Sequence, residues 1–496
     1  MRQSGLFKGV DKAASPMSFT MDEVKQLTGL GWPRTLTNLF NFAPRLVILA
    51  ALGHLPNGAT LVAGGGLGMM TANIIGNMLM RSSSFGIGGL FAQAYGAENL
   101  KRCGQLLQRA LLLHWLLIAC VTLPLTIFSK QILVACGQPP IVAEYAQAFL
   151  WVRLAALPFF TFTSDATMFL TGQKCVKTPA MANLAGAGCQ ILLCYVLTAH
   201  FGFIGAPLSM TIVEVSIALF LFFFSPHMLA KHGLGASWPD WLDWSTATHG
   251  WDELIGLGSQ AAVLIISEWF GWECMLLIAG GLCAGSDTCA PVEAMPIAAM
   301  LMVCQYVSTS GPGMAANVRV GNLLGEGNAQ AAWDSAKVGL YMSVVLAGSA
   351  AAALMATRFT IADMMVDDPA LSERIGRLMG VTVVYGIFAT LSAGWTQQCL
   401  FGMGANLRVP AMINFGSFYF VGIPVGGYLG FQRGWEEMGL WTGLVVANVL
   451  ITIGQGYYLI FVIDWPEAAR VARAKALEVQ AAAAKTKSTS GANALV

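Results

Sequence analysis

The sequence predicts an all-α integral membrane protein of twelve transmembrane helices, arranged as two pseudo-symmetric six-helix bundles. Three observations predict this fold class. The composition is too apolar for a water-soluble protein, twelve segments are long and apolar enough to cross a bilayer, and short motifs recur at a nearly constant spacing.

The composition sets the chain apart from soluble proteins. Hydrophobic residues make up 56% of its 496 residues, charged residues make up only 11%, and the mean hydropathy is +0.64. An average soluble domain contains about 25% charged residues. The formal net charge of +1 provides no basic field that would attract nucleic acid. These values exclude a nucleic-acid partner and predict a lipid bilayer as the surrounding solvent.

The predicted transmembrane helices follow from a simple length requirement. A helix that crosses the hydrocarbon layer needs about 20 mainly apolar residues. The segments that fit are residues 32–53, 59–80, 105–128, 147–170, 180–200, 203–225, 256–281, 290–315, 334–356, 378–401, 411–430 and 439–463.

The charged residues of the loops predict the orientation. When loops are assigned alternately to the two sides, most bases fall on the side that holds both termini, while the opposite loops contain several acids. The positive-inside rule then places both termini in the cytoplasm. We expect a cytoplasmic tail at residues 1–28, bundles at 29–235 and 236–465, and a cytoplasmic tail at 466–496 that begins as a short surface helix and becomes disordered.

Three short motifs occur twice. Pro179-Ala180-Met181-Ala182-Asn183 matches Pro410-Ala411-Met412-Ile413-Asn414 at an offset of 231 residues. The loop at residues 96–99 matches 325–328 at an offset of 229, and Gly29-Leu30-Gly31 matches Gly256-Leu257-Gly258 at an offset of 227. Three matches at nearly one offset predict an internal repeat. Because each copy would hold an even number of spans, the copies should be parallel, as in transporters with a substrate site between repeats.

Several short segments distributed over residues 29–463 form a recognisable set. They are Pro33 with Gly53-His54-Leu55, Gln93-Ala94-Tyr95-Gly96-Ala97 with Gln108-Arg109, Glu268-Trp269, Val318-Arg319-Val320-Gly321-Asn322 with Leu324-Gly325, and Val421-Gly422-Ile423-Pro424-Val425-Gly426. Together they resemble the multidrug and toxic compound extrusion (MATE) family, in its eukaryotic branch.

The resemblance implies a function that hydropathy alone does not. It implies secondary active export of organic cations, drugs or secondary metabolites in exchange for protons by alternating access, with sodium as the alternative coupling ion. We also expect a monomer in a plasma or vacuolar membrane that needs no cofactor.

The seventh predicted span contains two acids in an otherwise apolar run, Glu268 and Glu273. An ionisable group inside a membrane is costly and is a functional candidate by default. A carboxyl group in apolar surroundings holds its proton more readily than one in water, so it can exchange a proton for a cation. Trp269 and Trp272 stand one helical turn from these acids and could hold a cation through cation–π attraction.

The two acids do not share a face of a straight helix, because five residues rotate the side chain by about 140° net. Gly271 lies between them and would permit a local bulge that acts as a hinge. An acid pair neutralised by a neighbouring base, with indoles that merely pack, is the alternative.

Further polar and aromatic residues complete the predicted proton and substrate site. The family resemblance supports Asn73, although an interhelical hydrogen bond explains it equally well, and Glu293, which is about two residues out of register with the family acid there. The tenth span departs from the family because it lacks an acid near Thr390. This departure favours a less strongly cationic substrate. We also include Gln305, Tyr306 and Tyr385 in the site.

The first span combines a base with two prolines. Arg45 could pair with Glu268 or Glu273 and hold the acid ionised, which would argue against proton storage. Pro33 and Pro44 each remove a backbone donor, and we treat both as hinge candidates. A static kink is the alternative.

Two other functional classes compete with an antiporter. A membrane-embedded enzyme is disfavoured because the sequence has no HExxH, GxSxG or GxxxxGK[ST] motif. The missing phosphate-binding loop also argues against ATP-driven pumping by this chain alone. A lipid or lipid-linked substrate flippase should display a basic groove, whereas most bases here lie in the predicted cytoplasmic loops.

Overall fold

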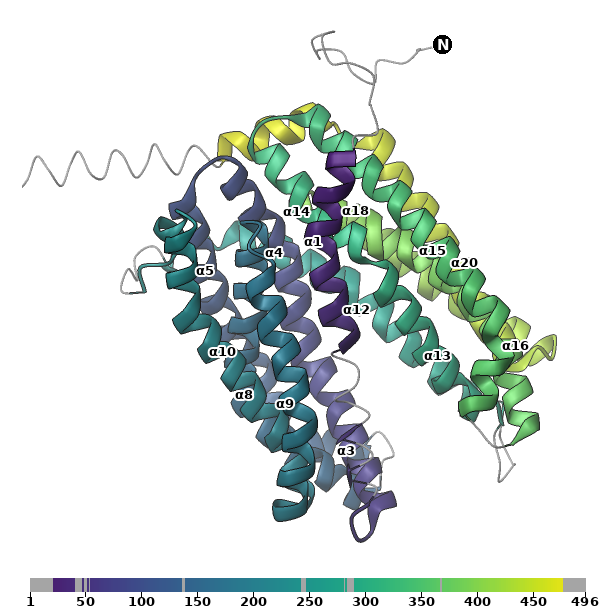
Figure 1. The fold of residues 1–496 in the computed structure, drawn as a ribbon. Coiled ribbons are helices and arrows are strands. Elements are labelled where there is room, and N and C mark those ends of the chain that lie inside the picture. The colour runs from purple at the N-terminus through teal and green to yellow at the C-terminus, as the bar shows by residue number, and fades with distance from the viewer. Residues whose placement is uncertain are drawn as a thin grey trace, which may run out of the picture. The chain divides into compact units, whose positions relative to one another are not determined.

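The computed structural model consists of helices joined by short loops (Figure 1). It describes residues 21–475 except 41–46, 49, 50, 53, 136–138, 242–246, 281, 283–289, 366 and 367. Arg45 and Pro44 therefore lie outside the described residues. The all-α prediction is confirmed.

The chain divides into two compact units, which we call unit 1 and unit 2. Unit 1 comprises Met1–Thr35 and Val263–Lys475, and unit 2 comprises Leu36–Ala262 and Ala476–Val496. Two helices contribute to both units. Helix α1 (Met21–Phe40) passes from unit 1 to unit 2 after Thr35, and α12 (Asp252–Gly280) passes from unit 2 to unit 1 after Ala262. The predicted bundle limits at residues 29–235 and 236–465 remain a prediction.

The remaining helices of unit 2 are long and mostly apolar. Short π-helical turns interrupt two of them. The elements are α3 (Gly58–Ala72), η1 (Asn73–Asn77), α4 (Met78–Gly96), α5 (Leu100–Leu117), η2 (Ile118–Thr122), α6 (Leu123–Ile127), α7 (Ser129–Ala135), α8 (Pro140–Gly172), α9 (Lys177–Phe201), η3 (Gly202–Ile204), α10 (Gly205–Lys231) and η4 (Gly235–Ser237).

Unit 1 contains a corresponding series of helices, of which three include π-helical turns. Its elements after α12 are α13 (Ala290–Thr309), α14 (Gly311–Gly325), α15 (Ala329–Met365), α16 (Pro369–Leu391), η6 (Ser392–Thr396), α17 (Gln397–Gly402), α18 (Arg408–Phe415), η7 (Gly416–Gly422), α19 (Ile423–Gly427), η8 (Tyr428–Gln432), α20 (Glu436–Tyr457) and η9 (Tyr458–Val462).

The repeated loop at residues 96–99 and 325–328 has the same structure in both copies. The third residue of the loop has a left-handed backbone conformation in both copies, with φ 58° at Glu98 and 84° at Gly327. Asn99 and Asn328 begin the next helix alike: each side-chain oxygen accepts a hydrogen bond from the backbone N–H three residues later. Equivalent backbone hydrogen bonds close both loops. The predicted internal repeat is therefore present in the backbone as well as in the sequence.

The repeated Gly-Leu-Gly motif makes a close helix contact in each unit. A Cβ atom on Gly31 would lie 2.5 Å from the carbonyl oxygen of Gly311 in unit 1. A Cβ atom on Gly258 would lie 2.5 Å from the Ser83 hydroxyl in unit 2. A Cβ atom on Gly31 would thus displace the backbone of α14, while Gly258 lets the first part of α12 approach the Ser83 side chain of α4 closely.

Helix α1 begins earlier than the sequence predicted. Residues 21–28, expected to belong to a tail, form its first turns. Arg319 of α14 donates two hydrogen bonds to the Glu23 carboxylate, at 3.0 and 3.2 Å. Leu27 is fully buried against Ala315 and Val338. A charged partner and an apolar contact in unit 1 explain why this polar segment is helical.

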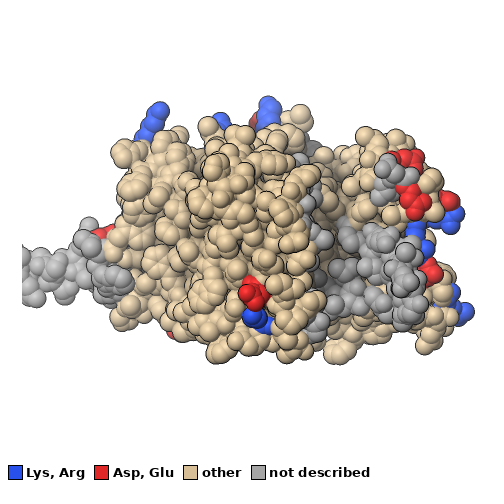
Figure 2. All heavy atoms as spheres, turned by 90° about the horizontal axis from the view of Figure 1, so that it is seen from below, with Lys and Arg blue, Asp and Glu red and all other residues tan. Residues whose placement is uncertain are grey.

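The surface has the character expected of a membrane protein. Among the described residues, eight helical stretches are long and apolar enough to cross a membrane. One of them, residues 177–231, contains the two helices α9 and α10. The first and seventh predicted spans include residues outside the described ranges. On the face drawn in Figure 2, charged side chains form only small separate groups among uncharged ones.

Close packing of α14 on η6 gives a test of the fold. A Cβ atom on Gly313 would lie 1.4 Å from the carbonyl oxygen of Gly394, so Gly313→Ala must displace backbone. We expect it to lower stability by about 1–3 kcal/mol or more, measured as a lower unfolding temperature of the detergent-purified protein. Gly348→Ala is the matched control, because nothing lies within 4 Å of that Cβ position. Equal unfolding temperatures for the two variants would contradict the described packing.

Candidate functional site

Helix α12 carries the first candidate carboxylate, Glu268, as one continuous α-helix from Asp252 to Gly280. No π-helical turn interrupts it at Gly271, so the local bulge considered above is absent from the helix. A Cβ atom on Gly271 would instead lie 3.3 Å from the Phe418 ring, which shows that this glycine permits close packing.

Two side chains of the neighbouring segment fix the part of α12 just before Glu268. Asn414 of α18 donates a hydrogen bond of 3.0 Å to the Leu264 carbonyl, and the Tyr419 hydroxyl of η7 donates one of 3.0 Å to the Ser267 carbonyl. Backbone carbonyls of a helix normally accept only from the next turn. These extra donors therefore hold α12 in a defined position beside α18 and η7.

Aromatic rings from three helices form a continuous row next to Glu268. Trp269 and Trp272 of α12 have ring centroids 5.2 Å apart, Trp272 and Tyr385 of α16 are 5.7 Å apart, and Tyr385 and Trp441 of α20 are 5.6 Å apart. Trp272 Nε1 donates a 2.7 Å hydrogen bond to the Tyr385 hydroxyl. Tyr385 is fully buried, whereas Trp269, Trp272 and Glu268 are partly exposed.

Glu268 faces hydroxyl groups from two other helices. Its carboxyl group interacts with the Tyr385 hydroxyl and lies close enough to Tyr306 of α13 to act on it electrostatically. The Asn448 amide of α20 lies against the same Tyr385 hydroxyl, and Ser392 donates a 3.0 Å hydrogen bond to the Asn448 Oδ1 atom. We call Glu268, Trp269, Trp272, Tyr306, Tyr385, Trp441 and Asn448 the carboxyl–aromatic cluster.

Paired hydroxyl groups fill the place in the tenth span where the family resemblance implies an acid. Thr390 of α16 is fully buried, and its hydroxyl lies 2.6 Å from that of Thr309 on α13. Gln305 donates a 3.2 Å hydrogen bond to the Val383 carbonyl, while its buried Oε1 atom has no hydrogen-bond partner among the described residues. The α13–α16 contact is therefore polar but carries no charge at Thr390.

Unit 1 thus brings together six of the residues singled out from the sequence, namely Glu268, Trp269, Trp272, Gln305, Tyr306 and Tyr385. The side chains of Glu273 and Glu293 lie outside the described part of the chain. Pro33 lies inside α1, two residues before the division between the units. The roles given to these three residues, and to Arg45, Pro44 and Gly271, stay predictions.

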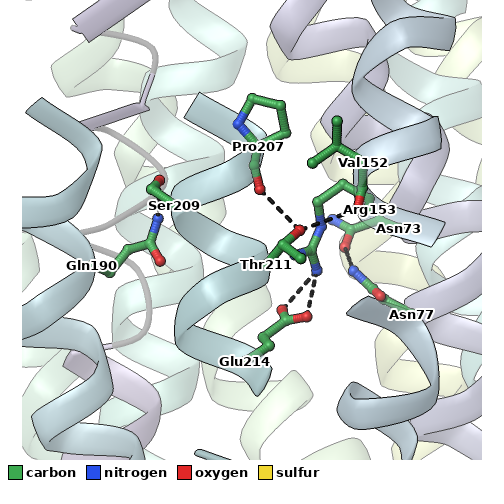
Figure 3. A network of polar contacts seen from close by, with 9 residues as sticks. All are labelled: Asn73, Asn77, Val152, Arg153, Gln190, Pro207, Ser209, Thr211 and Glu214. Carbon is green, nitrogen blue, oxygen red and sulfur yellow. Dashed lines mark hydrogen bonds and ion pairs between the residues drawn. The ribbon is translucent and has the colours of Figure 1, made fainter. Parts of the chain in front are cut away.

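Asn73 belongs to unit 2, where it begins the π-helical turn η1. The Asn77 side chain donates a 3.3 Å hydrogen bond to its Oδ1 atom within the same turn. Both side chains are drawn in Figure 3. This contact of Asn73 is thus local to its own helix. Its proposed role in ordering water or substrate remains a prediction.

Unit 2 also contains a buried ion pair that the sequence analysis missed. Arg153 of α8 donates hydrogen bonds of 2.7 Å to both carboxylate oxygens of Glu214 on α10, and the exposed side-chain fractions are 4% and 22% (Figure 3). Thr211 joins the same two helices by donating to the Val152 carbonyl. Applying the cost of membrane charges to every predicted span would have found this pair, because both residues lie in apolar runs.

A second buried group in unit 2 was also missed. His114 Nδ1 lies 2.9 Å from Asp165 Oδ2, and the Ser84 hydroxyl donates a 2.6 Å hydrogen bond to Asp165 Oδ1. All three side chains are fully buried. Within the described ranges, no group of three or more His, Cys, Asp and Glu side chains could hold a metal ion.

Comparison with known proteins yields consistent matches along nearly the whole chain. The family described as MatE matches residues 33–196 and 261–427. The chain is 30% identical over 462 residues to multidrug and toxin extrusion protein 1 of Danio rerio, covering 92% of this chain and 75% of that protein. It is 27% identical to the Homo sapiens protein of the same name, covering 93% and 78%, and 27% identical to Protein DETOXIFICATION 51 of Arabidopsis thaliana, covering 92% and 84%.

Solved structures resemble the fold equally well. The crystal structure of the eukaryotic MATE transporter AtDTX14 matches with a TM-score of 0.83 at 20% identity, covering 92% of this chain and 99% of that one. A structure of MATE in the bent conformation matches with a TM-score of 0.77 at 16% identity, covering 92% and 97%. The fold of these structures has twelve transmembrane helices, so the twelve-helix prediction is confirmed.

The ion pair of α8 and α10 can be tested by removing one or both charges. Glu214→Leu leaves Arg153 buried without its partner, which should cost about 3–5 kcal/mol. The double variant Arg153→Met/Glu214→Leu removes both charges, so we expect it to recover most of the loss in unfolding temperature. Glu144→Gln is the control, because its pair with Lys130 is 63% and 39% exposed and should contribute less than about 1 kcal/mol. A double variant no more stable than Glu214→Leu would contradict this interpretation.

Proposed function

Because the chain belongs to the MATE family, in its eukaryotic branch, we propose that it exports small organic molecules in exchange for protons. It is an integral multi-pass membrane protein and not an enzyme. The observation that supports the proposal most strongly is the position of Glu268. Its carboxyl group lies beside two tyrosine hydroxyls and a row of aromatic rings.

The surroundings of Glu268 suit a group that alternates between two charge states. The Tyr385 and Tyr306 hydroxyls can each act as donor or acceptor. Each can donate a hydrogen bond to an ionised carboxylate or accept one from a protonated carboxyl group. In a membrane interior, the ionised form needs a counter-charge. A proton or an organic cation can supply that charge, but the two cannot neutralise the same carboxylate together. Competition between them is the simplest basis for exchange.

The aromatic rings define the substrate class that we propose. Indole and phenol faces attract cations and stack with flat ring systems, and an adjacent carboxylate adds charge attraction. The partial exposure of Trp269, Trp272 and Glu268 leaves these groups accessible to a substrate. Thr390 replaces the acid that the family resemblance implies in the tenth span. We therefore infer a preference for weakly basic or singly charged aromatic compounds, including drugs and secondary metabolites.

A transport cycle follows from these properties. Substrate binds from the cytoplasm to ionised Glu268, the transporter opens to the other side, and a proton then replaces the substrate. Return of the protonated carrier releases the proton to the cytoplasm. We propose cytoplasmic termini, because the bases of the predicted loops lie on the side of the termini. A plasma or vacuolar membrane and a monomeric state complete the proposal.

Glu268→Gln tests the proposed coupling. The amide retains the size and hydrogen-bonding capacity of the acid but cannot bind or release a proton. In liposomes with an imposed pH gradient, we expect gradient-driven uptake of a fluorescent organic cation to fall at least about tenfold, the equivalent of about 1.4 kcal/mol. Glu273→Gln should be impaired as well if both acids of α12 take part.

Glu467→Gln is the matched control, because Glu467 is half exposed and pairs with Arg470 outside the predicted spans. It should transport like the unmodified protein. Uptake that ignores the pH gradient, or an unimpaired Glu268→Gln variant, would contradict proton coupling at Glu268. Uptake that follows a sodium gradient instead would replace the proton with sodium as the coupling ion.

Tyr385→Phe tests the contribution of the Tyr385 hydroxyl separately from that of its ring. The substitution keeps the stacking contacts with Trp272 and Trp441 but removes the hydroxyl that faces Glu268 and accepts from Trp272. We expect the pH at which transport is half maximal to shift while the apparent substrate affinity changes less than about threefold, since the stacking surface remains. A variant with an unchanged pH profile would exclude the hydroxyl from proton exchange.

A further inference from the structure

His114, Asp165 and Ser84 form a polar group that the carboxyl–aromatic cluster does not include. They come from three different helices of unit 2, α5, α8 and α4. Asp165 is the centre: one carboxylate oxygen accepts from Ser84 at 2.6 Å, and the other lies 2.9 Å from His114 Nδ1. We call these three residues the His–Asp–Ser group.

The surroundings of the His–Asp–Ser group are apolar. Each of its three side chains has an exposed fraction of 0%. The neighbouring residues on the same helices belong to the main hydrophobic core of unit 2, and they are Ile87, Ala110, Leu111, Phe162, Ala166 and Phe169. A net charge in such a place is costly, because no water solvates it.

One atom of the group has no partner. His114 Nε2 is buried and has no hydrogen-bond partner within the described part of the chain. When Nδ1 donates to Asp165, a neutral imidazole presents a lone pair at Nε2. The group then carries one uncompensated negative charge, that of Asp165. A proton that binds Nε2 converts imidazole into imidazolium and makes the group a neutral ion pair.

The other charged or titratable side chains on the helices around the His–Asp–Ser group do not provide the positive charge that this proton would bring. Arg102 pairs with Glu253, and Arg153 pairs with Glu214. Arg109 packs against Gly250, and Lys174 lies over the Tyr95 ring. Lys130 pairs with Glu144. The side chains of Arg81, Lys101, His227, Lys231 and Asp252 are exposed, and Cys103 is a buried thiol whose Sγ contacts the Phe91 carbonyl.

We propose that His114 and Asp165 form a second proton-binding site, which takes up and releases a proton during transport. Ser84 positions the Asp165 carboxylate. The proton comes from water on the side opposite the cytoplasm, occupies Nε2 while the group is enclosed, and returns to water on the cytoplasmic side. This inference rests on the proposed proton-coupled function and adds to it a second proton per cycle. Sodium suits the group less well, since a hard cation prefers oxygen ligands to imidazole nitrogen.

The number of protons moved per substrate distinguishes this inference from the proposed function. In liposomes with fixed gradients of a singly charged substrate and of pH, the membrane voltage at which net flux is zero gives the proton-to-substrate ratio, and flux that does not respond to voltage indicates one proton per substrate. We expect His114→Gln and Asp165→Asn to lower that ratio by about one proton while substrate exchange continues. His200→Gln is the matched control, because His200 is exposed and contacts the Val196 carbonyl of its own helix. It should keep the full ratio.

Ser84→Ala provides a milder variant should the other two fail to fold. It removes one hydrogen bond to the carboxylate and leaves His114 and Asp165 in place. We expect the proton-to-substrate ratio to persist and the pH of half-maximal transport to shift.

The outcomes separate the two claims. Transport in the unmodified protein that does not respond to a pH gradient contradicts the proposed function, and the second proton site with it. A pH-coupled unmodified protein whose ratio is unchanged in His114→Gln and Asp165→Asn overturns the second site alone. An unshifted pH profile in Ser84→Ala does the same.

Discussion

The constraint on which this structure depends is the cost of a polar or charged group surrounded by hydrocarbon. Each such group within the helices needs a partner from the protein, because lipid provides none. Arg153 pairs with Glu214, and Asp165 contacts both His114 and Ser84. Each of these contacts joins two different helices. Polar contacts therefore fix which helices are neighbours, while the apolar faces contribute burial without specifying a partner. The same cost makes Glu268 chemically useful, since it must exchange one counter-charge for another.

Small residues at helix crossings are the second requirement of this fold. Helices that cross closely must lack side chains at the point of contact, and the repeated Gly-Leu-Gly motif meets this need in both units. The two repeats are equivalent in their loops and in this contact. They differ in their polar groups, because unit 1 contains the carboxyl–aromatic cluster and unit 2 contains the His–Asp–Ser group.

Much of the fold could be predicted from the sequence, because hydropathy and repeat spacing are local or periodic signals. The spans, the loop repeat and the family were found in this way. The early start of α1 was not, because it depends on the distant Arg319. Glu268 was identified together with Glu273 as an acid in an apolar run, and Tyr306 and Tyr385 were included in the site. Their contact with Glu268 was not predicted, because they come from two other helices. Arg153, Asp165 and Glu214 were overlooked although the same rule for membrane charges applies to them, and no spacing rule links Asp165 to His114 across 51 residues.

The most direct test of proton exchange at Glu268 uses the substrate gradient as the driving force. Liposomes that contain the purified protein and an internal pH dye start with equal pH on both sides and receive a gradient of an organic substrate that has a permanent charge. Exchange predicts that substrate flow in one direction drives protons in the other, so the internal pH changes until the gradient is spent, and that Glu268→Gln abolishes this change. Substrate flow with no change in internal pH in the unmodified protein, or an undiminished change in Glu268→Gln, would contradict it.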